Sequence, residues 1–137
     1  MDESHGLKEV TCLVPLRPND FDWSRQLNNA VYPQLLESGR WVWALENCID
    51  LRMESLVGVV SRLELDYLKP VFWDPVATVT VRTGVRNIER FSIYLNQMVE
   101  DSGSQICARA RVQLAMYDSA KKVPVAIDLA KLRRNSA

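Results

Sequence analysis

Only one stretch of this chain has the hydrophobic period of a long helix, and almost everything after it alternates with a period of two. From an N-cap at Asn28 or Asn29 the helical pattern runs to about Ile49, with Pro33 in the first turn, where proline is tolerated. The apolar stripe consists of Val31, Leu35, Ser38, Val42, Leu45 and Ile49, widened by Tyr32, Leu36, Gly39 and Trp43. We expect a helix with so broad an apolar face to be largely buried.

The other elements read as strands. A short apolar strand at 9–17 precedes the helix, and alternating stretches at 57–68, 77–86, 91–99 and 105–116 follow it. The turn Asp101-Ser102-Gly103-Ser104 closes a hairpin, and weaker signals predict an edge segment at 121–127 and a helical turn at 128–134. Because one helix must cover the apolar face of the sheet, we predict an α+β fold with an antiparallel sheet of about five or six strands wrapped around one long central helix.

Length and charge set further bounds. The 137 residues suit one domain, expected at 9–137, after a polar and flexible tail at 1–8. Seventeen basic and seventeen acidic residues, without a long run of either sign, offer no electrostatic footprint for nucleic acid or an anionic membrane. The chain has neither a signal-like apolar segment near its start nor an apolar run long enough for a membrane span, so we expect a cytoplasmic protein.

The few histidine and cysteine residues restrict the chemistry. The single histidine, His5, lies in the tail, which argues against Ser-His-Asp and Cys-His triads and against histidine-ligated zinc. Cys12, Cys48 and Cys107 are odd in number and widely spaced, as expected of reduced structural thiols rather than of disulfides or a metal site. We therefore expect no metal and no cofactor, and carboxylates become the leading candidates for catalysis.

A polar turn feeds directly into the helix and collects the candidate groups. Asp20 and Asp22 precede the amide pair Asn28 and Asn29, and backbone N–H groups at a helix start can stabilise an oxyanion. A structural interpretation stands beside this one. The two aspartates can cap a polar turn, and the two asparagines can simply cap the helix.

Four short motifs, in this order of elements, carry a resemblance to a known family. They are the Asp20-x-Asp22 turn, Asn28-Asn29-x-x-Tyr32, Glu37-x-x-Arg40 and Leu65-Asp66-Tyr67-x-x-Pro70. Together they resemble the hot-dog-fold acyl-CoA thioesterases of the 4-hydroxybenzoyl-CoA thioesterase type, over roughly residues 9–128. The resemblance implies a hot-dog fold and hydrolysis of an acyl-CoA or carrier-bound acyl thioester, with coenzyme A present only as part of the substrate.

The resemblance also assigns roles. In the bacterial branch the second aspartate of the turn is the catalytic carboxylate, which is Asp22 here, and the tyrosine at the helix start corresponds to Tyr32. The histidine that many relatives carry at the helix start is Asn29, and the preceding Gly-His is replaced by Arg25-Gln26. A thiolate leaves easily, so a missing histidine is tolerable if Asp22 attacks the carbonyl or activates water and N–H groups near Asn29 hold the oxyanion.

Further candidates surround this centre. Glu37 is a second candidate acid, because another branch of the family uses a helix glutamate, although Glu37 and Arg40 can also simply pair on the helix surface. Trp23 and Trp41 are candidates for lining an acyl pocket. Arg86 and Arg90 lie at strand ends and are candidates for binding the phosphates of coenzyme A, although cations at such positions are often only solvated.

The family builds its pocket between subunits, so the resemblance implies a homodimer or a homotetramer. Pairing of long strand edges across a two-fold axis is consistent with this. Three functions stay open at this point: a thioesterase, which leads, a hot-dog dehydratase or hydratase, which the lack of a histidine in the folded region disfavours, and a non-catalytic acyl-binding or assembly protein.

Overall fold

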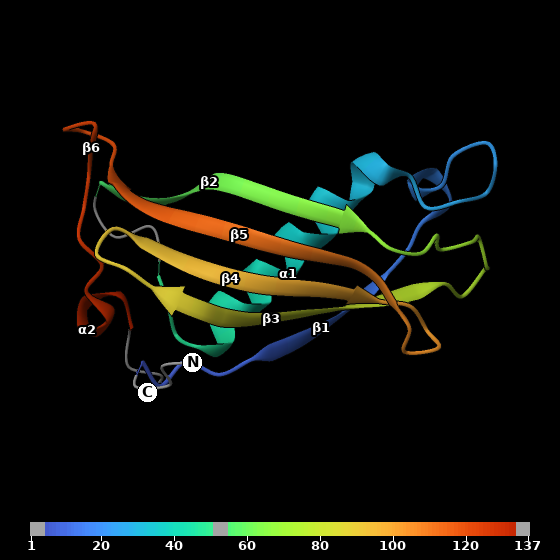
Figure 1. Ribbon diagram of the computed structural model, residues 1–137, viewed down its shortest axis with the longest axis horizontal. Coiled ribbons are helices and arrows are strands. Elements are labelled where there is room, and N and C mark those ends of the chain that lie inside the picture. Colours follow the sequence, from blue (N-terminus) through green and yellow to red (C-terminus); the bar gives the residue numbers. More distant parts are fainter. Residues whose placement is uncertain (1–4, 51–54, 134–137) are drawn as a thin grey trace.

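A curled antiparallel sheet encloses one long helix in the computed structural model, which describes residues 5–50 and 55–133 (Figure 1). The strand order is β1-β3-β4-β5-β2, and β6 pairs with the end of β5. The bounds are β1 Val10–Pro15, α1 Tyr32–Glu46, β2 Leu56–Tyr67, β3 Thr78–Ile88, β4 Ser92–Glu100, β5 Ile106–Asp118, β6 Val123–Pro124 and α2 Leu129–Leu132. The predicted arrangement of one central helix and a wrapped sheet is confirmed.

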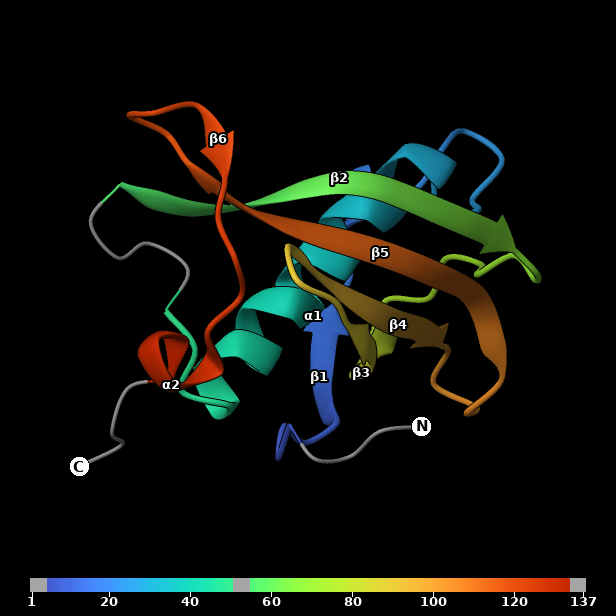
Figure 2. The same cartoon turned by 60° about the vertical axis from the view of Figure 1, so that its left-hand side comes forward.

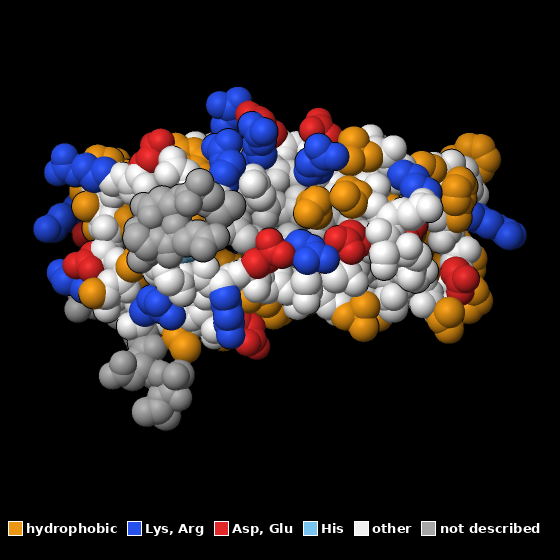
Figure 3. Space-filling view, turned by 60° about the horizontal axis from the view of Figure 1, so that its bottom comes forward, with side chains coloured by type: hydrophobic (Ala, Val, Ile, Leu, Met, Phe, Trp, Pro, Cys, Tyr) orange, Lys and Arg blue, Asp and Glu red, His pale blue; other side chains and the backbone are white. Residues whose placement is uncertain are grey.

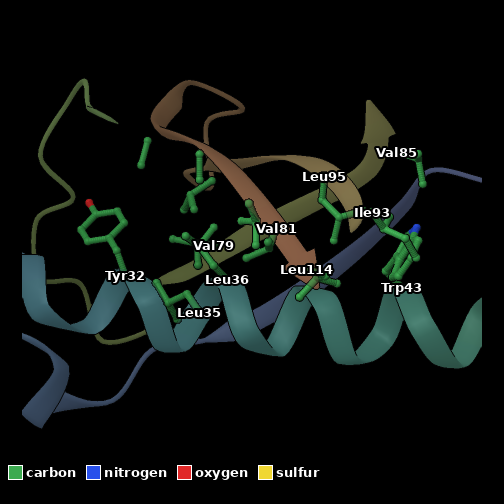
Figure 4. Packing of buried hydrophobic residues seen from close by; sticks show 14 of the residues in the cluster. Tyr32, Leu35, Leu36, Trp43, Val79, Val81, Val85, Ile93, Leu95 and Leu114 are labelled. Carbon is green, nitrogen blue, oxygen red and sulfur yellow. The ribbon is translucent and has the colours of Figure 1, made fainter. Parts of the chain in front are cut away.

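The core lies between α1 and the concave face of the sheet (Figure 2). The helix packs chiefly against β1, β3 and β4. Its side chains Leu36 and Trp43 point toward inward-facing residues of these strands (Figure 4). Leu36 and Trp43 are almost completely buried, and burial of each such side chain is worth roughly 1.5–3 kcal/mol. This packing fixes the helix axis and therefore the position of the helix start.

The buried face of α1 differs from part of the prediction. The structure buries Tyr32, Leu35, Leu36, Gly39 and Trp43, whereas Leu45 is 68% exposed, so the prediction of a largely buried helix is wrong for that side. The helix turns the face that carries Gly39 toward the sheet, because a residue without a Cβ lets the strands approach closely.

The helix ends at Glu46 rather than near Ile49. The backbone of Cys48 has a left-handed conformation, with φ at +57°, which a continuing α-helix does not contain. The side chain of Asn47 secures this end, because it accepts a hydrogen bond from Lys8 N–H and donates to the Trp43 carbonyl. The helix therefore ends where its last turn is bonded to the N-terminal segment.

Of the predicted tail at 1–8, residues 1–4 lie outside the described residues. In the remainder, Leu7 is buried in the core and His5 Nδ1 accepts a hydrogen bond from its N–H. This part packs against the domain. Among the described residues, no helix is both long enough and apolar enough to span a membrane.

The five strands predicted from the alternating pattern and the first apolar stretch correspond to β1 to β5. The turn after β4 closes as expected, with Asp101 Oδ1 accepting hydrogen bonds from the N–H groups of Gly103 and Gln105, each at 2.9 Å. The two weak C-terminal signals correspond to β6 and α2, and Asp128 caps α2 through the N–H of Ala130. Sheet edges are formed by β1 on one side and by β2 on the other.

Candidate active site

The start of the central helix is organised by Asn28. A single 3-10 turn, Asn29–Val31, leads into α1, and the Asn28 side chain accepts a hydrogen bond from Ala30 N–H at 3.0 Å. The Asn28 carbonyl accepts a second from Val31 N–H at 2.9 Å. Of the backbone N–H groups at 29–31, those of Ala30 and Val31 are therefore already engaged. No residue in the described part of the chain accepts a hydrogen bond from the Asn29 N–H.

A small pocket of about 230 Å³ opens beside this helix start. Tyr32 and Tyr67 meet in its wall as an edge-to-face pair with ring centroids 5.1 Å apart. The hydroxyl of Tyr67 donates to the Asn29 carbonyl at 2.9 Å and so ties β2 to the helix start. Its lining is Gln26, Leu27, Asn29, Tyr32, Tyr67, Leu68, Lys69 and Pro70. The structure thus brings together two predicted site residues, Asn29 and Tyr32.

Tyr32 is a neutral hydrogen-bond donor in this pocket. Burial raises the pKa of its phenol to about 12, so the hydroxyl keeps its proton at neutral pH. Within the described part of the chain this hydroxyl has no hydrogen-bond partner. A buried phenol with an unused proton is suited to donate to a carbonyl oxygen that enters the pocket.

Asp22 lies on the exposed loop next to this pocket rather than in its wall. Its Oδ1 accepts hydrogen bonds from Ser24 N–H at 2.9 Å, Ser24 Oγ at 2.6 Å and Gln26 N–H at 3.2 Å. The Ser24 side-chain bond is the main reason that the pKa of Asp22 lies below its ordinary value of 3.8. The loop therefore presents an ionised carboxylate whose second oxygen is not used by the turn.

The other aspartate of the motif is structural. Asp20 is buried, and its carboxylate accepts hydrogen bonds from the N–H of Arg17 at 2.8 Å and from the Arg17 guanidinium at 3.2 Å. These contacts hold the short 3-10 turn Pro18–Asp20. The two aspartates of the Asp-x-Asp motif thus have different environments, and only Asp22 faces solvent.

Glu37 and Trp41 line a second, apolar groove of about 560 Å³ further along the helix. The groove lies between the second half of α1 and the start of β2, at Val57–Val60. Arg40 also lines it, but the described residues form no Glu37–Arg40 ion pair. Arg40 instead donates to the buried side chain of Gln97 at 3.1 Å. The structure therefore separates Glu37 from the helix start.

The remaining predicted residues are dispersed in the single chain. Trp23 is 96% exposed at the tip of the Asp22 loop. Over the face drawn in Figure 3, hydrophobic side chains are interspersed with basic and acidic ones. Arg86 and Arg90 lie near the turn between β3 and β4, at the opposite end of the molecule (Figure 1). Each guanidinium lies over an aromatic ring, that of Tyr94 or of Phe91. Lys69, which is not among the predicted site residues, lines the small pocket and is ion-paired with Asp101.

Comparison with known proteins identifies the family. The model of the thioesterase-like superfamily matches residues 16–133, which is most of the chain. The chain belongs to the thioesterase-like superfamily. The match includes the whole region from the Asp22 loop to α2, so the loop, the helix start and the groove all belong to the superfamily domain. No curated protein matches the chain significantly.

Solved structures of similar shape agree with this membership in the thioesterase-like superfamily. A Pseudomonas aeruginosa protein described as a thioesterase candidate is 25% identical, with a TM-score of 0.79 over 88% of this chain and 93% of that one. The DHNA-CoA thioesterase of Staphylococcus aureus is 15% identical, with a TM-score of 0.80 over 88% and 81%. A second S. aureus protein, solved in complex with CoA, is 9% identical, with a TM-score of 0.78 over 95% and 89%. The fold of this chain is the hot-dog fold.

Several residues at these sites were not among the sequence-based candidates. Tyr67 stands in the Leu65-Asp66-Tyr67 motif, but its sequence does not reveal that its hydroxyl reaches the helix start. Gln97 had a usable signal: it is a polar residue at an inward position between Leu95 and Val99 of β4. A buried amide at such a position needs hydrogen-bond partners in the core, and Arg40 supplies one.

Proposed function

We propose that this protein hydrolyses acyl-CoA thioesters to a carboxylic acid and free coenzyme A. The observation that carries the proposal is the small pocket at the helix start, where the Asn29 N–H and the neutral Tyr32 hydroxyl lie beside the loop that presents Asp22. Membership in the thioesterase-like superfamily and the likeness to a protein solved in complex with CoA support it.

The chemistry begins at the thioester carbonyl. The free oxygen of Asp22 attacks the carbonyl carbon, the C–S bond breaks, and coenzyme A leaves as a thiolate that takes a proton from water. Water then cleaves the mixed anhydride and restores Asp22, giving the acid. In the alternative route Asp22 removes a proton from a water molecule that attacks the carbonyl directly. Both routes need an ionised Asp22.

The helix start supplies the second requirement. As the carbonyl oxygen becomes negative, it accepts hydrogen bonds from the Asn29 N–H and the Tyr32 hydroxyl, two donors at this pocket that the turn itself does not use. Removing one such donor typically raises the barrier by about 2.7–4 kcal/mol. Tyr67 holds this arrangement in place through the Asn29 carbonyl. We assign Glu37 no catalytic role, because it lies along the apolar groove.

A homodimer, alone or as half of a tetramer, completes the proposal. Among the described strands, the edge strand β2 has one neighbour, β5, so one row of its backbone groups has no partner strand there. Val60 and Leu63, opposite the buried residues Leu114 and Val112, remain 43% and 38% exposed because α1 does not cover them. Antiparallel pairing of two β2 strands would cover this edge. It would also bring the partner's Arg86 and Arg90 to the side of the helix start, where phosphates of coenzyme A can be bound.

The alternative is a non-catalytic acyl-binding protein. One observation favours it: the Asp22 Oδ1 and two of the N–H groups at the helix start already serve the turn and the helix cap. Measurement of thiol release from acyl-CoA substrates separates the two functions. The enzyme releases coenzyme A with repeated turnover. The binding protein retains acyl-CoA without releasing any thiol.

The low pKa of Asp22 predicts the pH dependence of hydrolysis. Since hydrogen bonding holds this pKa below 3.8, the carboxylate stays ionised until the pH falls below that value. Its contribution to stability is likewise present above the unfolded pKa and lost as the pH falls through the folded pKa. We therefore expect kcat/KM not to fall as the pH is lowered from about 8 to about 5. A pH–rate profile with an apparent pKa in that interval would point to a different base.

Substitution of Leu63 with Lys tests the dimer. A lysine at this inward position of β2 places a charge in the proposed interface, so we expect a species of half the wild-type mass in sedimentation velocity, with reduced hydrolysis. The control is Leu13→Lys, because Leu13 is 67% exposed on β1, the opposite edge of the sheet. Wild-type protein that sediments as a monomer would contradict the proposal, as would a Leu63 variant that stays dimeric.

A further inference from the structure

Three charged side chains, those of Glu37, Arg40 and Asp50, are among the residues that line the apolar groove. Most of the groove is formed by Trp41, Trp43, Leu45, Val57 and Val60, which suit a hydrocarbon chain. At its end nearer the helix start, the same wall carries Glu37 and Arg40. A groove of about 560 Å³ has the size of a small-molecule site, and a few placed polar groups in such a site set specificity.

The side chain of Arg40 is held in place by a hydrogen bond to Gln97. Gln97 is completely buried, and its amide nitrogen donates to the Leu36 carbonyl at 2.9 Å and to Thr83 Oγ1 at 2.8 Å. These two bonds turn the amide oxygen toward Arg40, which donates one hydrogen bond to it at 3.1 Å. A guanidinium has five N–H donors, and the described residues accept a hydrogen bond from only one of them.

Glu37 faces the same end of the groove as an acceptor. Its carboxylate forms no ion pair and accepts no hydrogen bond from the residues that the structure describes. Burial lowers the pKa of Arg40, and the Glu37 charge opposes that shift, so the two groups interact at a distance without touching. When the groove is closed by a ligand or a second subunit, both groups lose water and need new partners.

We propose that the groove binds the acyl chain of the thioester and that Arg40 and Glu37 together bind a hydroxyl group on that chain. This inference rests on the proposed function. A hydroxyl accepts a hydrogen bond from Arg40 and donates one to Glu37, which satisfies both groups at once. A carboxylate on the chain is repelled by the Glu37 charge. A plain alkyl chain leaves Glu37 and the Arg40 donors that do not bind Gln97 without partners.

The helix geometry sets where on the chain the hydroxyl lies. Because a helix rises 1.5 Å per residue, Glu37 and Arg40 lie about 9–14 Å from the helix start at Val31. The small pocket and the groove both open between α1 and β2, at opposite ends of β2. A thioester at the helix start therefore places the far end of a medium-length chain, rather than its first carbons, beside Arg40.

Titration calorimetry with non-hydrolysable thioethers tests this inference without requiring turnover. The probes are octyl-CoA, ω-hydroxyoctyl-CoA and ω-carboxyheptyl-CoA thioethers. Because a hydrogen bond to a charged group is involved, we expect wild-type protein to bind the hydroxyl probe about tenfold more tightly than the octyl probe. Equal binding of these two probes, or tightest binding of the carboxyl probe, would overturn the inference.

Two variants and a control locate the effect. Arg40→Met should remove the preference for the hydroxyl probe while octyl binding persists. Because that change also leaves the Gln97 oxygen without its donor, Glu37→Leu is the second variant, and it leaves the Gln97 network intact. We expect it to reduce the preference as well. Glu46→Leu, on the same helix but outside the groove, should preserve the preference. Arg40 and Glu37 variants that prefer the hydroxyl probe as strongly as the Glu46 variant does would contradict the inference.

Hydrolysis is scored separately. Thiol release from octanoyl-CoA and ω-hydroxyoctanoyl-CoA reports on the proposed function, whereas the thioether affinities report on the groove. Preferential binding of the hydroxyl probe without any thiol release supports the hydroxyl site and contradicts the thioesterase function. Thiol release together with equal affinities for the octyl and hydroxyoctyl thioethers supports the thioesterase function and contradicts the hydroxyl site.

Discussion

Replacing Asp22 with Asn is expected to reduce kcat/KM for acyl-CoA hydrolysis by about 10²–10⁴-fold, because either route requires the ionised carboxylate. The fold should survive. The asparagine keeps an oxygen in the place of Oδ1, which accepts hydrogen bonds from the N–H groups of Ser24 and Gln26. The side chain is exposed, so we expect the melting temperature and the oligomeric mass to stay close to those of wild type.

The matched control for this substitution is Asp74→Asn. Asp74 is also an exposed aspartate in a loop at the same end of the molecule, and its Oδ1 accepts a hydrogen bond from Val76 N–H at 2.9 Å. It should keep wild-type kcat/KM. An Asp22→Asn protein that hydrolyses acyl-CoA at the wild-type rate would show that Asp22 only holds its turn.

Replacing Gly39 with Ala should destabilise the protein although alanine is the better helix former. A Cβ at this position would lie 2.4 Å from Val81 Cγ1 and 3.0 Å from Thr83 Oγ1. Alanine gains about 0.5–1 kcal/mol in helix propensity, but over-packing of a filled core typically costs about 1–3 kcal/mol and more when backbone must move. We therefore expect a net loss of free energy of unfolding, measured by urea denaturation.

The same substitution should also reduce activity. The added methyl group pushes α1 away from the sheet at the level of Gln97, whose amide nitrogen would be 3.1 Å from the new Cβ. A displaced helix moves the helix start and the groove together. The control is Gly103→Ala in the exposed turn after β4, where the nearest atom, Asp101 Oδ1, is 3.4 Å away. Equal stabilities of the two variants would contradict the close helix–sheet contact described above.

Much of the fold could be predicted from local patterns. Period-two alternation located β2 to β5 because each of these strands has one face in the core, and the Asn28 cap and Pro33 marked the helix start to within a residue or two. The rotation of the helix could not be predicted, because its apolar stripe is wider than the face that one sheet can cover. Leu45 belongs to that excess, and together with Trp41 it forms part of the wall of the groove.

The candidate site was predictable in part for a similar reason. Asn29 and Tyr32 are close in sequence, and the helix brings them to one pocket. Gln97 and Tyr67 reach the helix from strands distant in sequence, so their hydrogen bonds to Arg40 and Asn29 depend on strand register. Local patterns do not contain that register. The engagement of the Ala30 and Val31 N–H groups by Asn28 likewise depends on the exact course of one 3-10 turn.

The most direct measurement is release of free thiol from a panel of aliphatic, aromatic and β-keto acyl-CoA thioesters by the wild-type protein. The proposal that the Asp22 loop and the helix start form a thioesterase site predicts repeated turnover of at least one of these substrates, with one carboxylic acid formed for each coenzyme A. Binding of acyl-CoA without thiol release from any member of the panel would contradict it and would identify a non-catalytic acyl-binding protein.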